Sequence, residues 1–395
     1  MISVHEALAT LLDLVAPTEV EEVPINRAAG RVLAETVHAR RTQPPFSASA
    51  MDGYAVRRAD AGPGAQLRVI GEAVAGRRFD GDVGPGQAVR IFTGAPVPEG
   101  ADDILLQEDA TRDGDALTVH EDRDEARYIR AAGQDFSEGD PMEAPRRLGP
   151  ADIALLAAMN LPRVRVHRRP VLALVPTGDE LVMPGETPGP DQIVCSNNFG
   201  LHALLERVGA EPRLMPIARD SHESLGEALR RARRADLIVT LGGASVGDHD
   251  LVRSVAGTQG LDLAFYKVAM RPGKPLTAGR MKGVPLIGLP GNPVSAMVCG
   301  HIFLRPMVDR MLGLPAAALA REDGTLGADL GPNGGREHYM RARLARQDGT
   351  WICTPFERQD SALLSVLGQA DALMVRQAGE GPLEAGTKVP FIRLT

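Results

Sequence analysis

Four short segments in the second half of the 395-residue chain combine glycine, proline, small hydroxyls and charged residues. They are PTGDEL (176–181), LGGASVGDHD (241–250), RPGKP (271–275) and LPGNPVSA (289–296). Each follows an apolar run typical of a buried strand, so we expect all four at the carboxyl ends of strands in one sheet. Ligands of open α/β sheets bind at that edge, and the segments are therefore predicted to line one cleft.

The glycine-rich segment could bind an anion. Gly242, Gly243 and Gly247 would let backbone N–H groups approach a phosphate with no Cβ in the way, and Ser245 could add a hydroxyl donor. The alternative is a tight turn from a strand to a helix, because glycine-rich turns are common.

The segment LPGNPVSA predicts the start of a long helix that ends near residue 312. Asn292 would be its N-cap and Pro293 its first residue, so that free N–H groups and the positive end of the helix dipole face the cleft. Plain capping explains these two residues without a ligand. The rest of the motif, which includes Pro290 and Ser295, favours a binding site.

Two cations and several acids accompany these segments. Arg271 and Lys274 lie on a Pro-Gly turn that could hold them over a phosphate or another oxyanion, although a surface turn is the alternative. The acids are Asp179, Glu180, Asp248 and Asp250. Carboxylates beside phosphate donors are ligands that Mg²⁺ uses when it bridges a substrate, whereas an N-cap or turn acid is the bland interpretation.

These residues indicate an α/β enzyme that binds an anion and a metal ion and acts on a phosphorylated or nucleotide-bearing substrate. The patterns GxGxxG and GxxxxGK[ST] are absent, which disfavours a standard dinucleotide enzyme and a P-loop kinase. HExxH and GxSxG are absent as well.

Composition limits the class of protein further. The chain has 44 Lys and Arg against 51 Asp and Glu, a net charge of −7, so a general nucleic-acid binder is not expected. Three distant cysteines offer neither a disulfide framework nor a CxxC site, which fits a reducing cytoplasm. The N-terminus does not resemble a signal peptide, and no apolar run approaches the 18 residues of a membrane span.

The elements that must position the cleft follow from periodicity. Ser3 and Glu6 form a capping box before a helical repeat, residues 150–160 predict a second helix, and strands alternate with helices from 170 onward. The fold class is multidomain α/β and β, with a doubly wound α/β domain. The expected domains are an N-terminal helical and linker domain (1–41 plus 135–168), an inserted β domain (42–134), the α/β domain (169–315) and a C-terminal β domain (316–395).

Two further motifs, PPFSASAMDGYAVR (44–57) and RIFTGAPVP (90–98), precede the four segments. Together these motifs resemble the MoeA family of molybdopterin molybdenumtransferases, which is related to the gephyrin E domain. The resemblance implies a MoaB/MogA-like α/β domain that binds molybdopterin and a β-barrel-like C-terminal domain. It also implies an elongated homodimer whose cleft lies between the α/β domain of one subunit and the inserted β domain of the other.

In that family, molybdate is inserted into the dithiolene of adenylylated molybdopterin with Mg²⁺, and AMP is released to give molybdenum cofactor. By motif matching, Asp52 and Thr93 would reach the cleft from the β domain, and Glu180 and Asp250 would lie closest to the metal and the scissile phosphate. Arg271 and Lys274 would hold molybdate or phosphate. Weaker matches are Asp220, Asp135 and Ser365. The resemblance further implies a cytoplasmic location and, as partners, the adenylyltransferase or proteins that deliver the cofactor to molybdoenzymes.

The chain departs from the family pattern at three positions. Ser47 stands where Asp is frequent, Ala244 where Val is common, and Arg271 where Lys is frequent. A paralogue with an altered substrate therefore stays open. So do two other functions, a molybdopterin adenylyltransferase and a scaffold that retains the fold to bind partners. The flanking β domains and MDGYA disfavour the first, and the retained acids and cations disfavour the second.

Overall fold

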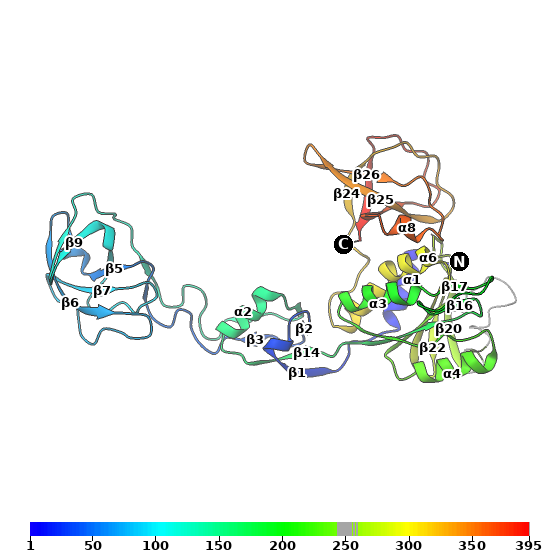
Figure 1. Cartoon of the computed structure of the whole chain (residues 1–395), viewed down its shortest axis with the longest axis horizontal. Coiled ribbons are helices and arrows are strands. Elements are labelled where there is room, and N and C mark those ends of the chain that lie inside the picture. The colour runs from blue at the N-terminus through cyan, green and yellow to red at the C-terminus, as the bar shows by residue number, and fades with distance from the viewer. Residues whose placement is uncertain (243–254, 256, 258–259, 395) are drawn as a thin grey trace. The chain divides into compact units, whose positions relative to one another are not determined.

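The computed structural model describes residues 1–242, 255, 257 and 260–394. Their contacts divide the chain into two compact units. The first unit comprises Met1–Glu21, Gly30–Ala34 and Val166–Thr395, and the second comprises Glu22–Ala29 and Glu35–Arg165. Figure 1 labels the elements of both, and each unit is described by itself. No helix among the described residues is long and apolar enough to cross a membrane.

A six-stranded sheet forms the centre of the first unit, in the order β18-β15-β19-β23-β22-β20. The strands are β15 (Val171–Pro176), β18 (Glu211–Leu214), β19 (Leu237–Leu241), β20 (Leu261–Lys267), β22 (Pro275–Met281) and β23 (Val284–Leu289). The first four in spatial order are parallel, β22 is antiparallel to β23, and β20 is antiparallel to β22. Because β20 consequently runs in the same direction as β15, β19 and β23, the four glycine- and proline-rich segments all begin at one edge of the sheet, as predicted.

The sequence did not predict β22, whose residues PLTAGRM carry a proline and a glycine. Gly279 is needed there because a Cβ would collide with the backbone of Asp262 on the neighbouring strand β20. The sheet is therefore mixed, with four parallel strands and an antiparallel pair at one side.

Helices cover both faces of this sheet. They are α1 (Val4–Asp13), α3 (Asn197–Arg207), α4 (His222–Ala232), α6 (Pro293–Cys299) and α7 (Arg305–Met311). Leu172 and Leu174 of β15 pack in one cluster with α1, α3, α6 and α7, whereas Ala173 and Val175 pack in another with α4. This alternation is what an extended strand between two layers requires. The prediction of a doubly wound α/β domain is confirmed.

Helix α1 begins with the predicted capping box. The Glu6 N–H donates to Ser3 Oγ at 3.1 Å, and the Ser3 N–H donates to Glu6 Oε2 at 2.8 Å. These bonds stabilise the carboxylate and hold the pKa of Glu6 below its usual value. Val4, Leu8 and Leu11 are buried against the α/β domain.

The helix predicted from Asn292 to about 312 is continuous but not uniform. A π-helical turn, η4 (Gly300–Leu304), separates α6 from α7. Pro306 has no N–H to donate within an α-helix, and the Arg305 N–H instead donates to the Gly300 carbonyl five residues earlier.

A closed five-stranded barrel lies at the C-terminal end of the chain. Its strands are β24 (Glu322–Leu326), β25 (Glu337–Gln347), β26 (Thr350–Pro355), β27 (Ala372–Arg376) and β28 (Lys388–Arg393). The circuit β25-β26-β24-β28-β27 closes because β27 also pairs with β25. The short strand β21 (Met270–Arg271) adds to β25 in parallel, and α8 (Leu364–Leu367) follows the loop after β26. The predicted barrel-like domain is confirmed.

The second unit is mostly β structure. Its main sheet has the order β8-β5-β7-β6-β10-β9 (Figure 1). These strands are β5 (Gly53–Val56), β6 (Gln66–Ala73), β7 (Gln87–Ile91), β8 (Asp103–Leu106), β9 (Ala110–Asp113) and β10 (Ala116–Val119). Short elements are η1 (Ile25–Arg27), β3 (Val37–His38), β4 (Ala48–Ser49), η2 (Arg58–Asp60), η3 (Gln107–Asp109), β11 (Ile129–Arg130), β12 (Pro141–Met142) and β13 (Arg146–Arg147). Helix α2 (Pro150–Ala158) starts with Pro150, as predicted. Strands β1 (Val20–Pro24) and β14 (Arg163–His167) contain the unit boundaries, and β2 (Val32–Leu33) belongs to the first unit.

Candidate functional site

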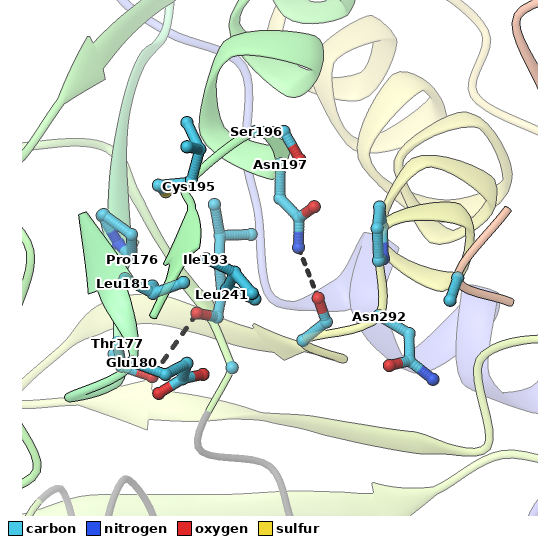
Figure 2. A pocket seen from close by; sticks show the side chains of 15 residues that line it. Pro176, Thr177, Glu180, Leu181, Ile193, Cys195, Ser196, Asn197, Leu241 and Asn292 are labelled. Carbon is cyan, nitrogen blue, oxygen red and sulfur yellow. Dashed lines mark hydrogen bonds between the residues drawn. The ribbon is translucent and has the colours of Figure 1, made fainter. Parts of the chain in front are cut away.

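A pocket of about 410 Å³ opens at the carboxyl ends of β15, β19 and β23. Three of the predicted segments meet there, represented by Glu180, Gly242 and Asn292 with Pro293. Figure 2 shows Glu180, Leu181 and Ile193 on one side of the pocket and Asn197 and Asn292 on the other. The loop 191–197 supplies five of the lining residues, Ile193, Val194, Cys195, Ser196 and Asn197.

Two glycines let the backbone of the pocket come close together. Gly242 has φ +98°, and a Cβ there would lie 2.7 Å from the carbonyl oxygen of Thr177. A Cβ on Gly291 would lie 3.6 Å from Gly242 Cα. Side chains at these positions would fill the space in which a ligand could meet the backbone.

The loop that carries Glu180 is fixed by Arg219. Its Nη1 donates to the carbonyl groups of Gly178, Asp179 and Leu181 at 3.3, 3.1 and 3.0 Å. The Asp220 N–H donates to Asp179 Oδ1 at 3.1 Å, so both acids of this corner serve the turn. Glu180 remains exposed, and it is the one charged side chain among the lining residues that the structure describes.

The start of α6 contacts the loop that follows β26 of the barrel. Asn292 occupies the N-cap position, but its side chain makes no capping bond, and Nδ2 donates to Ser361 Oγ at 2.8 Å. The Val294 N–H donates to the Ser361 carbonyl oxygen at 3.0 Å. The expectation that the first N–H groups are free is therefore wrong for Val294. Pro290 and Ser295 are buried beside this turn.

The two predicted cations face a different neighbourhood. Within the described part of the chain, neither Arg271 nor Lys274 lines the pocket. Arg271 pairs through β21 with His338 on β25, and the Lys274 carbonyl oxygen accepts the Val268 N–H at 3.1 Å. Burial and the positive charge of Arg271 lower the pKa of His338 to about 4, so His338 is neutral at pH 7.

Arg341 on β25 is fully buried next to this group. Its Nη2 donates to the carbonyl oxygens of Arg358 and Asp360 at 3.3 and 2.9 Å. Nε and Nη1 have no hydrogen-bond partner among the described residues, and burial together with the charge of Arg271 lowers the pKa of Arg341. A buried guanidinium with two free donors is costly unless an anion completes it.

The loop held by Arg341 reaches the pocket, since it contains Ser361 and the lining residue Ala362. Ser365 lies further along, in α8, where its carbonyl oxygen accepts a bond from Gln369 at 3.1 Å. It is exposed and does not line the pocket.

The second unit contains one bonded pair of predicted residues. Asp52 Oδ1 accepts bonds from the Thr93 N–H at 2.7 Å and from Thr93 Oγ1 at 2.8 Å. These bonds lower the pKa of Asp52, so its carboxylate is charged at neutral pH. Asp135 is exposed on a loop of the same unit.

The remaining candidates lie outside the described residues. They are Gly243, Ser245, Gly247, Asp248 and Asp250. Within the described ranges, no three His, Cys, Asp or Glu side chains come close enough to hold a metal ion.

Sequence reasoning did not single out Arg219, Arg341 or Ser361. Arg219 is adjacent to the predicted Asp220, but nothing in its own sequence signals three carbonyl contacts. Arg341 alternates with apolar residues in a strand pattern, YMRARL, in which its inward orientation could have been suspected. Ser361 gave no local signal.

The fold and the pocket define a multidomain α/β and β protein with a ligand cleft at the carboxyl edge of its central sheet. Three family models match it: "MoeA N-terminal region (domain I and II)" over 2–160, "Probable molybdopterin binding domain" over 173–310 and "MoeA C-terminal region (domain IV)" over 323–394. The chain belongs to the MoeA family of molybdopterin molybdenumtransferases, and the resemblance of its motifs is confirmed.

Similar proteins support this membership along the whole chain. A molybdopterin molybdenumtransferase of Nostoc is 34% identical and covers 100% of this chain and 94% of its own length. Molybdopterin molybdenumtransferase 2 of Mycobacterium tuberculosis is 35% identical over 100% of both chains. The crystal structure of the molybdopterin biosynthesis MoeA protein of Pyrococcus horikoshii has a TM-score of 0.84 at 26% identity, again over 100% of both.

Proposed function

We propose that the chain inserts molybdate into adenylylated molybdopterin and releases AMP, which gives molybdenum cofactor. Membership of the family and the names of its relatives support this reaction. The single observation that carries it is Arg341, whose two unpartnered nitrogens are suited to an oxyanion beside the loop that reaches the pocket. Molybdate is a tetrahedral dianion, and a guanidinium offers it two parallel donors.

In this proposal, Arg341, Arg271 and Lys274 hold molybdate or phosphate. Gly242, Gly243, Ser245, Gly247, Asn292 and their neighbours in LPGNPVSA bind the adenylylated pterin. Glu180 and Asp250, with Asp52 and Thr93, act near the scissile phosphate. Asp220, Asp135 and Ser365 are weaker candidates. Positioning and charge neutralisation would supply most of the rate, because little covalent chemistry is required of the protein.

A Mg²⁺ site is also part of the proposal. The described residues contribute only Glu180 to it, and they do not form a metal centre by themselves. Asp248 and Asp250 would have to complete the set. Hard carboxylates suit Mg²⁺, which would neutralise phosphate charge when bound. Loss of AMP release on chelation and its return with added Mg²⁺ would support this part.

Three further statements rest on the family resemblance. We propose that the chain forms a homodimer, works in the cytoplasm, and meets the adenylyltransferase or proteins that deliver the cofactor. Sedimentation of the purified chain tests the first. Affinity isolation with those proteins tests the last.

The reaction is tested by mixing the chain with adenylylated molybdopterin, Mg²⁺ and molybdate. AMP release that depends on molybdate supports the proposal. Adenylylation of the pterin from ATP would instead indicate an adenylyltransferase, and neither reaction would indicate a scaffold. Asp250→Ala is expected to keep the fold and the dimer but to fail to make active cofactor.

Arg341→Met sharpens this test, with Arg343→Met as its matched control. Both residues lie on β25, but Arg343 is exposed and bonds Gln369 at 2.9 Å. We expect Arg341→Met to raise the molybdate concentration needed for half-maximal AMP release by at least about tenfold, equivalent to about 1.4 kcal/mol. The control should change it less than about twofold, in line with an exposed contact. Equal effects of the two variants would remove Arg341 from oxyanion binding.

A further inference from the structure

We infer that Ile193 and Val194 form an apolar edge that binds the planar heterocycle of the substrate, with the Glu180 carboxylate beside it. This inference rests on the proposed function and assigns one part of the pocket to one part of the substrate. The ligand chemistry is a flat, neutral, nitrogen-containing ring, which the proposed substrate contains twice, as a purine and as a pterin.

The first observation is exposure. Ile193 is 59% exposed and Val194 is 44% exposed, although both are large apolar residues, and both line the pocket. Leu181 continues the same wall. Adjacent apolar side chains left in water at a concave site gain free energy when a ligand covers them, because apolar area is removed from water.

The second observation is that this edge is held in place. Strand β17 (Ile193–Val194) pairs in parallel with β16 (Leu181–Val182). The Ile193 N–H donates to the Glu180 carbonyl oxygen at 2.8 Å, and the Cys195 N–H donates to the Val182 carbonyl oxygen at 2.8 Å. The apolar edge and Glu180 are therefore joined by main-chain bonds. A ring that lies on the edge would have the carboxylate at a fixed position, as Figure 2 lets the reader follow.

The third observation is the charge of the pocket. Glu180 is the one charged group among its described lining residues, and the cations Arg271 and Arg341 are not in the lining. A carboxylate repels a phosphate but accepts bonds from ring N–H and amino groups. The described walls thus suit the neutral ring, and the anionic end of the substrate would lie toward the cations.

Space and shape agree with this assignment. A volume of about 410 Å³ is within the range of small-molecule pockets. Gly242 and Gly291 leave part of the lining without side chains, which admits a flat molecule against the backbone.

The experiment uses the full chain and four probes. Adenosine and 6-hydroxymethylpterin carry the two candidate rings without phosphate, whereas inorganic phosphate and ribose 5-phosphate carry phosphate without a ring. Affinities are measured by calorimetry for the natural chain, Ile193→Ser, Val194→Ser and the control Leu214→Ser. Leu214 is 39% exposed on β18 and does not line the pocket.

We expect at least one ring probe to bind, and each edge variant to weaken it about tenfold. Leu214→Ser and the two ringless probes should show less than a twofold change. Whichever ring responds identifies the part of the substrate that the edge holds.

The inference is overturned if neither ring binds, if the edge variants bind rings as the natural chain does, or if they change the molar mass in solution, which would make the edge a subunit contact. Molybdate-dependent AMP release by the natural chain, measured in parallel, keeps the two proposals apart. Release without an edge effect on ring binding refutes only this inference, whereas no release refutes the proposed function.

Discussion

Gly242→Ala is the change whose effect the structure specifies most closely. At φ +98° an alanine is strained by about 1–3 kcal/mol. Its Cβ would also lie 2.7 Å from the Thr177 carbonyl oxygen, and forcing extra volume against backbone costs about 1–3 kcal/mol more. Thr177 and Gly242 both line the pocket, so relief of the contact must move its walls apart.

Gly283→Ala provides the matched control. Gly283 has φ +89°, but a Cβ there would meet nothing within 4 Å. Both variants carry the backbone strain, and only Gly242→Ala carries the contact, so the first-unit unfolding transition should differ between them by roughly 2–12 °C. Calorimetry measures this difference, and molybdate-dependent AMP release should fall at least about tenfold in Gly242→Ala alone. Equal melting temperatures, or full activity in both variants, would show that the approach to Thr177 is not rigid and would refute the reasoning.

Two other predictions concern pH and the barrel loop. Burial lowers the pKa of His301 and His338 to about 4, below the ordinary 6.5 that applies in the unfolded chain. Between these values the unfolded chain binds more protons, so stability should fall as pH drops from 6.5 to 4, by up to about 3 kcal/mol for each histidine; melting temperatures of His338→Gln should depend less steeply on pH, and an unchanged slope would contradict this. Asn292→Ala and Ser361→Ala should each lower kcat/KM, and the double variant should show a coupling of about 0.5–1.5 kcal/mol from their 2.8 Å bond. Strictly additive effects would show that the bond does not position α6.

Much of the fold could be predicted because its signals are local. The Ser3 and Glu6 pair sets the start of α1, and alternating strands and helices from 170 onward set the α/β domain. The meeting of Glu180, Gly242 and Asn292 followed from one rule, that parallel strands end at a common edge.

What could not be predicted depends on contacts between distant segments. Arg271 begins at the expected edge but pairs with His338, because β21 adds to a barrel strand more than sixty positions later. Ser361 and Arg341 act through that barrel, and no local pattern encodes the closure of β27 onto β25. The missed strand β22 shows the converse, since its proline and glycine read as a turn until neighbouring strands are known.

The strand β21 has a consequence for how this chain can be cut or recombined. Main-chain bonds join it to β25, and Tyr339, Leu373 and Ile392 of the barrel share one apolar core with α1 and α6. A truncation before residue 316 would leave both that core and the polar backbone of β21 open to water. The terminal barrel is therefore no detachable module, and a gene that borrows the catalytic half must carry the last eighty codons with it.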